Sequence, residues 1–419
     1  MQISENDRKF YLEQALKAAD WFTRQQLLFP KPWPGDQYRF LYYYYMPEKK
    51  YVPGLNWSHG RALFVLSEAY ALTGDRRYLD SAETGMRFLK ALQPLDPYYE
   101  VTYGSIHEEI PQAPRGGILD GAQAASGMLM MHRVTGKHDY LRRGRAFCEF
   151  LRRTWHPEKG IAVFADYDNE SISYAKSMGC IHQASAIPLW HLHNITGESQ
   201  YLPIIIDSAD RIIACQRADG GVYYIENAES LPEPAFNHHW GLGQGVEKSL
   251  LRNDDAIVVI VIAAYRITGD RKYLDFLVKY ADWIVANGPT ERPYCGFGIQ
   301  ANNVLDIGRE SGRDYSAWVL DNLKKHCLDL QVQGSDDPKA EGGFRGEDEE
   351  GNSGIFGGTA LDYVVTRTTC YMAGLLFRLS GKGTGAGFSA DGLKTMNPFS
   401  APTLGKATYE AQILTGGKR

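Results

Sequence analysis

The sequence lacks the features of a chain that is exported, inserted in a membrane or bound to nucleic acid. Its first residues show neither the basic start nor the apolar core of a signal peptide, and no apolar run reaches the ~18 to 20 residues of a membrane span. The formal net charge is −5, with both signs spread along the chain, which provides no basic surface for nucleic acid or an anionic membrane. We therefore expect a cytoplasmic protein, or an exported one whose signal has been removed, without nucleic-acid or membrane partners.

Cysteines are few and widely separated. No two of the six stand in a CxxC pair or at the spacing of a metal site, and most lie in apolar or helical surroundings, where a small buried thiol is the usual finding. We therefore predict free thiols, no metal and no cofactor. The six are Cys148, Cys180, Cys215, Cys295, Cys327 and Cys370.

One short phrase recurs along the chain and joins two kinds of helix. A mostly apolar helix ends in Thr-Gly or Ser-Gly, and a polar or charged residue then opens an amphipathic helix. The glycine fits the position after a helix end, where the backbone takes a positive φ. Each copy therefore predicts a helical hairpin, and the hydroxyl residues of the copies are Thr73, Thr135, Thr196, Thr268 and Ser380.

The spacing of these copies predicts six hairpins. The interval from Thr268 to Ser380 is nearly two repeats long, so we infer one further turn that has lost the phrase. Residues 313–332 are the best candidate for the outer helix of this hairpin, and its inner partner, within residues 290–312, is expected to be short.

The two kinds of helix predict a closed ring. Helices before each phrase are apolar on most sides, as helices packed on both faces must be, whereas those after it are charged on one face. The chain thus resembles the (α/α)6 toroids of carbohydrate-active enzymes, an all-α fold, with short β-hairpins expected in its loops. We predict one such domain over residues 1–380. The tail, residues 381–419, is rich in Gly, Ser, Thr and Pro, and either lies along the surface or contacts a neighbouring subunit in a homo-oligomer.

Acidic and imidazole side chains stand where the predicted inner helices begin. Because these helices run the same way, their starts should gather at one mouth of the ring. Two carboxylates close together, or one among apolar neighbours, hold the raised pKa that a general acid needs. A single aspartate before a helix is also a common N-cap, contributing about 1 kcal/mol, and a buried histidine is often a hydrogen-bonded core residue. The catalytic candidates are Asp254, Asp255, Asp120 and His182.

Aromatic and basic residues near these helix starts indicate a sugar-binding site. Aromatic rings stack on the C–H faces of sugars, and an arginine fork binds a carboxylate through two parallel hydrogen bonds. Four consecutive tyrosines, residues 42–45, cannot all point inward in a strand, so some should face a cavity or solvent. Core packing and ion pairing with nearby acids are the competing explanations. The substrate-binding candidates are Trp57, His59, Glu108, Glu109, Arg115, His238, His239, Trp240, Arg252, Tyr363 and Arg367.

The segment RNDDAIVVIVIAAYRITGDRKYLD, residues 252–275, resembles the unsaturated glucuronyl and rhamnogalacturonyl hydrolases. In that family an Asp-rich start precedes an inner helix with a similar end. The aspartate acts as general acid and base and adds water across the C4–C5 double bond of a terminal uronic residue. The resemblance implies this role for Asp254 or Asp255. Residues 256–259, Ala-Ile-Val-Val, replace the small and Met-containing pattern that follows the aspartate in the family.

A second segment, SIHEEIPQAPRGGILDGAQAASGMLMMHRVTG, residues 105–136, resembles the Glu-Glu-aromatic-Pro stretch before a helix in glucuronyl C5-epimerases, with Ile110 in place of the aromatic residue. Both resemblances imply a uronic acid substrate, but they imply different reactions.

These observations leave three classes of function open. The leading hypothesis is a glycoside hydrolase that removes a terminal glucuronic-acid-type residue, saturated or unsaturated, from an oligosaccharide. It requires an acid, a second carboxylate or activated water, and a carboxylate clamp. One alternative is a sugar epimerase of the same fold, with His182 and either His59 or His239 as paired bases, or a polysaccharide lyase with a His/Tyr pair. The third class is a sugar-binding protein without catalysis.

Overall fold

Inner and outer helices make up most of the described chain. The computed structural model describes residues 3–28, 37–174, 180–223, 256–288, 296–346, 355–383 and 389–391. The inner helices are α2 (Asn56–Thr73), α4 (Ile118–Thr135), α6 (Cys180–Gln183) continued by α7 (Ile187–Thr196), α9 (Ile257–Thr268), α11 (Phe297–Ser311) and α13 (Thr366–Leu379). The outer helices are α1 (Glu5–Gln25), α3 (Arg76–Leu92), α5 (His138–Thr154), α8 (Leu202–Ile213), α10 (Arg271–Asn287) and α12 (Ser316–His326).

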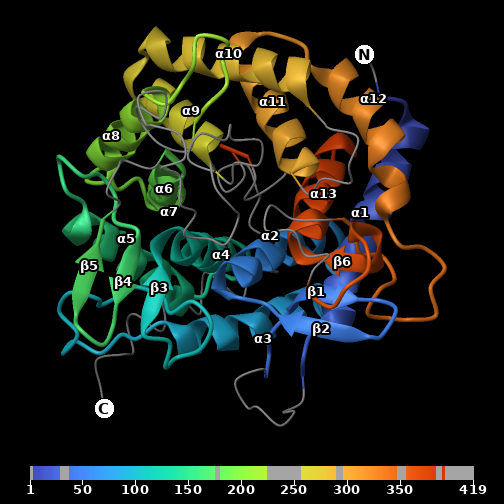
Figure 1. The fold of residues 1–419 in the computed structure, drawn as a ribbon, viewed down its shortest axis with the longest axis horizontal. Coiled ribbons are helices and arrows are strands. Elements are labelled where there is room, and N and C mark those ends of the chain that lie inside the picture. Colours follow the sequence, from blue (N-terminus) through green and yellow to red (C-terminus); the bar gives the residue numbers. More distant parts are fainter. Residues whose placement is uncertain are drawn as a thin grey trace.

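The inner helices form a closed ring (Figure 1). Each packs against the next in the order α2, α4, α7, α9, α11 and α13, and α13 returns to α2. The outer helices lie around this ring, and α1, from the start of the chain, packs on α13, from near its end. This arrangement confirms the predicted (α/α)6 toroid.

Burial follows the two predicted helix types. In α9 every side chain from residue 257 to residue 264 is at most 2% exposed, because protein surrounds this inner helix on all sides. Helices α2 and α4 approach until their backbones touch at glycines. A Cβ on Gly60 would lie 2.2 Å from the Gln123 carbonyl oxygen, and a Cβ on Gly127 would lie 2.8 Å from the Gly60 Cα. No larger residue fits at this crossing without moving a helix.

The turns that end the inner helices share one geometry. In the first, the Thr73 hydroxyl donates to the Ala69 carbonyl at 2.7 Å and accepts the Asp75 N–H at 3.1 Å. Asp75 then caps α3 by accepting the Arg77 N–H at 2.9 Å. The turn glycines have φ between 71° and 77° and are Gly74, Gly136, Gly197, Gly269, Gly312 and Gly381.

The sixth turn has not lost the phrase, so that expectation was wrong. Helix α11 ends in Ser311 and Gly312, and the Ser311 hydroxyl donates to the Ile307 carbonyl at 2.7 Å, as threonine does in the other turns. Serine supplies the same hydroxyl. The expectation of a short inner helix is also wrong, since α11 has 15 residues. Its outer partner, α12, covers only part of residues 313–332.

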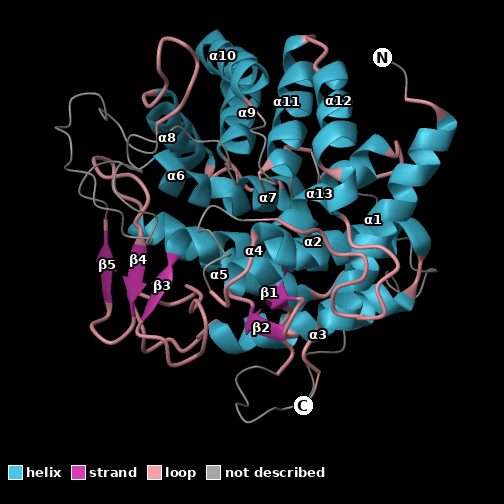
Figure 2. Cartoon of the chain, turned by 45° about the vertical axis from the view of Figure 1, so that its right-hand side comes forward, coloured by secondary structure: helices cyan, strands magenta, loops and turns pink. Residues whose placement is uncertain are grey.

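Two small sheets lie on one flank of the helical ring (Figure 2). The first has the strand order β2 (Lys50–Pro53), β1 (Leu41–Tyr45) and β6 (Tyr363–Val365), and the second has the order β3 (Arg115–Gly117), β4 (Phe164–Asp166) and β5 (Ser171–Ser173). Isolated antiparallel bridges, Gln216 to Val222 and Gln331 to Phe344, add short β-structure in two further loops. The loops therefore carry the short β-structure that was expected.

All four consecutive tyrosines are buried, which corrects the expectation that some would face a cavity or solvent. They lie in β1, the central strand of its sheet, and none is more than 7% exposed. Tyr44 packs into the main core and its hydroxyl bonds to Asp337, whereas the other three pack with Trp57 and Tyr363. Successive side chains do point to opposite faces of the sheet, but other parts of the protein cover both faces.

The described cysteines are buried free thiols, as predicted for Cys148, Cys180, Cys215, Cys327 and Cys370. Cys295 lies outside the described residues. Among the helices that the structure describes, none combines the length and apolar character needed to cross a membrane.

The turn geometry predicts that Gly312→Ala destabilises the fold by about 1–2 kcal/mol, because alanine resists the positive φ at this position. A Cβ there meets no atom within 4 Å, so the cost is one of backbone conformation alone. Gly312→Asn is the matched control, since asparagine tolerates this conformation and should lose less. Denaturant unfolding of both variants measures the difference, and equal losses would contradict the explanation.

Candidate functional site

The starts of α2 and α13 meet in a contact between tryptophan and arginine. The Arg367 guanidinium lies 5.4 Å from the Trp57 ring centroid and 5.9 Å from that of Tyr371, and its Nε donates to the Tyr371 hydroxyl at 3.3 Å. Tyr42 meets the Trp57 ring edge-on at 5.2 Å. Both Trp57 and Arg367 are buried. A cation and an aromatic ring thus lie together where two inner helices begin.

Glu108 and Asp120 form a carboxyl pair at the start of α4. Their side chains are hydrogen-bonded to each other, and Glu108 also accepts the N–H of Gly117. Both carboxyl groups lie against Gly117, since a Cβ built there would be 2.9 Å from Asp120 Oδ2 and 3.7 Å from Glu108 Oε2. A hydrogen bond between two carboxyl groups forms only when one of them carries a proton.

Asn56 attaches this pair to the start of α2. Its backbone N–H donates to the Glu108 carbonyl at 2.9 Å, and its Nδ2 donates to the His107 carbonyl at 3.1 Å. Asn56 is fully buried and stands directly before Trp57. The carboxyl pair and the contact between Trp57 and Arg367 therefore belong to one region, where α2, α4 and α13 begin. We call this region the candidate site.

Burial shifts the pKa of Glu108 in the direction that a general acid requires. Loss of solvent raises the pKa of Glu108 above its ordinary value of 4.5, and the nearby charge of Glu109 raises it further. The hydrogen bonds from Gly117 and Asp120 oppose this effect but do not cancel it. A half-buried carboxyl with a raised pKa can deliver a proton at a higher pH than a solvated one.

Two of the predicted binding residues make hydrogen bonds to backbone groups. His59 is fully buried, its Nδ1 donates to the Leu55 carbonyl at 2.8 Å, and its Nε2 accepts the Phe40 N–H at 2.9 Å. Burial lowers the pKa of His59 to about 3, so the ring is neutral. The Tyr363 hydroxyl donates to the Gly357 carbonyl at 2.8 Å and accepts the Phe356 N–H at 3.0 Å. These contacts give both side chains a structural role.

The remaining described candidates are Arg115, Glu109 and His182. The Arg115 side chain is 69% exposed, and its Nε lies 3.3 Å from Asp166 Oδ2. Glu109 is exposed and pairs with Arg39 across 3.9 Å. His182 is buried in α6. The ion-pair explanation thus accounts for Arg115 and Glu109.

Six candidates lie outside the described residues. They are the catalytic candidates Asp254 and Asp255 and the binding candidates His238, His239, Trp240 and Arg252. Their predicted roles stay predictions.

Sequence reasoning missed two residues that organise the candidate site. Asn56 holds the backbone of Glu108, and Tyr371 accepts the hydrogen bond of Arg367. A signal for Tyr371 was present, because residues four apart on a helix are neighbours. Asn56 offered no such signal, since its partners lie in a loop some fifty positions away. Within the described part of the chain, no group of three or more His, Cys, Asp or Glu side chains could hold a metal ion.

Comparisons with known proteins identify other proteins that share this fold. No family model and no curated protein matches the sequence. Among solved structures, the chain is similar to the unsaturated glucuronyl hydrolase of Bacillus sp. GL1, with 18% identity over 88% of this chain and 96% of that one and a TM-score of 0.60. It is also similar to the cellobiose 2-epimerase of Bacillus thermoamylovorans, with 12% identity, 87% and 98% coverage and a TM-score of 0.59.

A third similar structure is an α-1,6-mannanase of Salegentibacter sp., with 14% identity over 89% of this chain and 98% of that one and a TM-score of 0.58. It is an inactive variant in which two consecutive aspartates are replaced by asparagine. At these identities the likeness concerns the fold, which hosts both hydrolases and epimerases.

The raised pKa of Glu108 predicts a pH-dependent stability. The folded protein binds this proton more tightly than the unfolded chain, so the stability that the group contributes is full below about pH 4.5 and is lost as pH rises through the raised pKa. Glu108→Gln removes the titration, so its unfolding free energy should improve relative to the parent as pH rises above 4.5. Denaturant unfolding across this pH range measures the difference. Glu109→Gln, at the exposed neighbour, is the control, and the same trend in both would assign the effect to net charge.

Proposed function

We propose that this chain is a glycoside hydrolase that removes a terminal glucuronic-acid-type residue, saturated or unsaturated, from an oligosaccharide. The observation that carries the proposal is the pair of Glu108 and Asp120, in which burial raises the pKa of Glu108, in the same region as Trp57 and Arg367. A proton donor, an aromatic face and a guanidinium are the three groups that such a substrate requires.

In this proposal the carboxyl pair acts as the proton donor. For a saturated substrate the proton goes to the glycosidic oxygen, the bond from that oxygen to the anomeric carbon breaks, and a water hydroxyl joins the carbon. The remaining proton of the water returns to the carboxyl pair. For an unsaturated substrate the proton goes to C4 and the hydroxyl to C5. The C5 hemiketal so formed opens to a ketone, and the hemiacetal left at C1 then collapses to an aldehyde and releases the rest of the oligosaccharide as the alcohol. Both routes consume one water and leave the pair as it began.

Asp254 and Asp255 complete the proposal as the second acidic group, with one as a catalytic carboxylate and the other as a helix cap. The resemblance of residues 252–275 to the unsaturated glucuronyl hydrolases supports this role. The mannanase of similar fold, inactive when two consecutive aspartates are replaced, supports the same kind of arrangement. The other binding candidates, among them His182, His238, His239, Trp240 and Arg252, remain proposals for substrate contacts.

An epimerase is the second candidate, since an enzyme of similar fold is a cellobiose 2-epimerase. Epimerisation by two bases needs two groups that exchange protons near neutral pH. His59 does not suit this role, because both of its ring nitrogens are bonded to backbone and its pKa is lowered to about 3. The pairing of His59 with His182 is therefore disfavoured, and the hydrolase stands first.

Incubation with saturated and unsaturated glucuronyl disaccharides distinguishes these functions. Hydrolysis yields products that together contain one added water, and it removes the absorbance of an unsaturated uronate. Lyase action creates that absorbance, and epimerisation leaves the mass unchanged. A change of mass without added water, or no reaction on either disaccharide, would reject the proposed hydrolase.

Replacement of the carboxyl pair should abolish most of the activity. Asp120→Asn and Glu108→Gln keep the shape and hydrogen-bonding capacity of the side chains but remove a titratable proton, so kcat should fall by about 10²–10⁴-fold. Glu109→Gln, at the exposed neighbour, should retain nearly all activity. Melting temperatures confirm that each variant is folded. Asp254→Asn and Asp255→Asn are measured beside them, and one of these two should be as inactive as Asp120→Asn.

Arg367 should determine the preference for an acidic sugar. Arg367→Lys keeps the positive charge but loses the two-pronged hydrogen bond, so KM for the uronyl substrate should rise by about tenfold while a neutral glucoside is little affected. Arg115→Lys is the control, because that exposed side chain pairs with Asp166. Equal losses on acidic and neutral substrates would show that Arg367 supports the fold through Trp57 and Tyr371 instead.

A further inference from the structure

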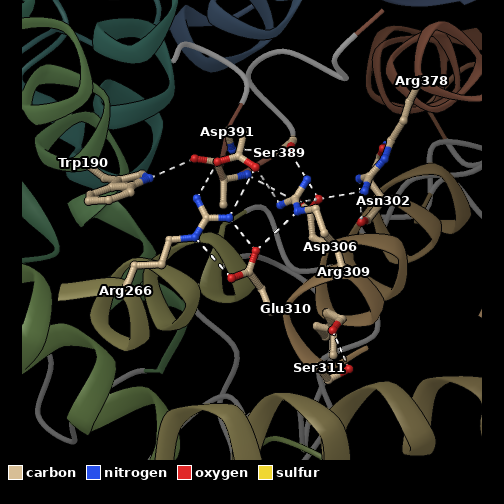
Figure 3. A network of polar contacts seen from close by, with 12 residues as sticks. Trp190, Arg266, Asn302, Asp306, Arg309, Glu310, Ser311, Arg378, Ser389 and Asp391 are labelled. Atoms are coloured by element: carbon tan, nitrogen blue, oxygen red, sulfur yellow. Dashed lines mark hydrogen bonds and ion pairs between the residues drawn. The ribbon is translucent and has the colours of Figure 1, made fainter. Parts of the chain in front are cut away.

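Side chains from four successive inner helices surround residues 389–391, a short piece of the C-terminal segment (Figure 3). They come from α7, α9, α11 and α13, and in α9, α11 and α13 they stand near the helix end, away from the candidate site. The residues that take part are Trp190, Arg266, Asp306, Arg309, Glu310 and Arg378.

The neutral part of this piece is held by hydrogen bonds on both sides. Trp190 Nε1 donates to the Ala390 carbonyl at 3.0 Å, and the Ala390 N–H donates to Asp306 Oδ2 at 3.2 Å. The Ser389 hydroxyl donates to Asp306 Oδ1, also at 3.2 Å. Ser389 and Ala390 are each only 1% exposed. Burial to this degree, with every polar group of Ala390 bonded, is the property of a bound peptide and not of a tail lying on a surface.

The acidic part is held by two arginines. Asp391 pairs with Arg266, and its Oδ2 lies 3.0 Å from Arg309 Nη2. Arg266 also pairs with Glu310, whose side chain is 11% exposed. The Arg266 and Asp391 side chains are 24% and 22% exposed, so water screens this pair less than a surface pair, whereas Arg309 is 41% exposed.

The charges balance only when Asp391 is in place. Arg378 and Arg309 both contact the fully buried Asp306, at 2.8 Å and 3.2 Å. Among the side chains of this cluster, three arginines face Asp306, Glu310 and Asp391, one acid for each base. Without Asp391 the cluster would contain one arginine more than it has acids, and the partly buried Arg266 would lose one of its two carboxylate partners.

We propose that this cluster is a binding site for a carboxylate-bearing peptide, occupied in this protein by its own residues 389–391. Asp391 is the anchor, and Asp306 and Trp190 recognise the peptide backbone before it. Because the ligand contacts three consecutive inner helices, α7, α9 and α11, its binding holds this arc of the ring together. The proposal does not depend on the catalytic function.

Chemical rescue tests the site in the full-length chain. Asp391→Ala removes the carboxylate and should lower the melting temperature by about 4–8 °C. Acetate, a free carboxylate, should restore a substantial part of this loss when compared at about 0.1 M with chloride of the same ionic strength, since general screening is then equal. Ser389→Ala should be destabilised without acetate-specific rescue, because its carboxylate remains. Asp275→Ala, which removes an exposed acid paired loosely with Arg271, should show neither effect.

Hydrogen exchange gives an independent measurement. The Ala390 amide donates to a buried carboxylate, so it should exchange at least about 100-fold more slowly than an unstructured amide in the parent, and lose this protection in Asp391→Ala. An unprotected Ala390 amide in the parent would overturn the proposal. An unchanged melting temperature in Asp391→Ala, or equal effects of acetate and chloride on it, would also overturn it.

Discussion

A helix surrounded by protein on every side reaches solvent only near its two ends, and this constraint organises the molecule. The inner helices are mostly apolar, and α9 is entirely so over residues 257–264, because they contact the ring on both flanks and the outer helices behind. Buried polar residues such as Arg61 and Asp306 are exceptions, and two groups of charged residues lie near the helix ends. The carboxyl pair stands at the start of α4, and the arginine cluster stands near the ends of α9, α11 and α13.

The fold could be predicted from the sequence because its main determinants are local. A threonine or serine followed by glycine terminates a helix through contacts with residues at most four positions away, so the phrase can be read without knowledge of the rest. The turn at Ser311 was overlooked because the helix before it contains polar residues such as Asn302 and Asp306, and therefore lacks the apolar pattern of the other inner helices. The buried tyrosines of β1 show the opposite case. Their exposure depends on which segments cover the sheet, and one of these, β6, comes more than three hundred residues later.

The sequence predicted which residues lie at the candidate site, but it did not predict the contact between Glu108 and Asp120. The direction of the inner helices places Asp120 and Arg367 at helix starts, and both are found there. That Asp120 bonds to Glu108 depends on the path of the loop through residues 108–117, which no periodic pattern specifies. His59 shared the same kind of position, yet its ring binds the backbone of Phe40 and Leu55. Helix position alone could not separate a histidine that holds a strand from one that meets a substrate.

The backbone contact between Gly60 and Gly127 limits which residues near the candidate site can change without moving a helix. The contact fixes the separation of α2 and α4, whose first turns contain Trp57 and Asp120. The distance between these two helix starts is therefore set by the helix crossing. Exchange of residues in the loop that carries Glu108 leaves this separation unaltered, whereas enlargement of either glycine alters it first. The loop can therefore vary in sequence more freely than the crossing of the two helices.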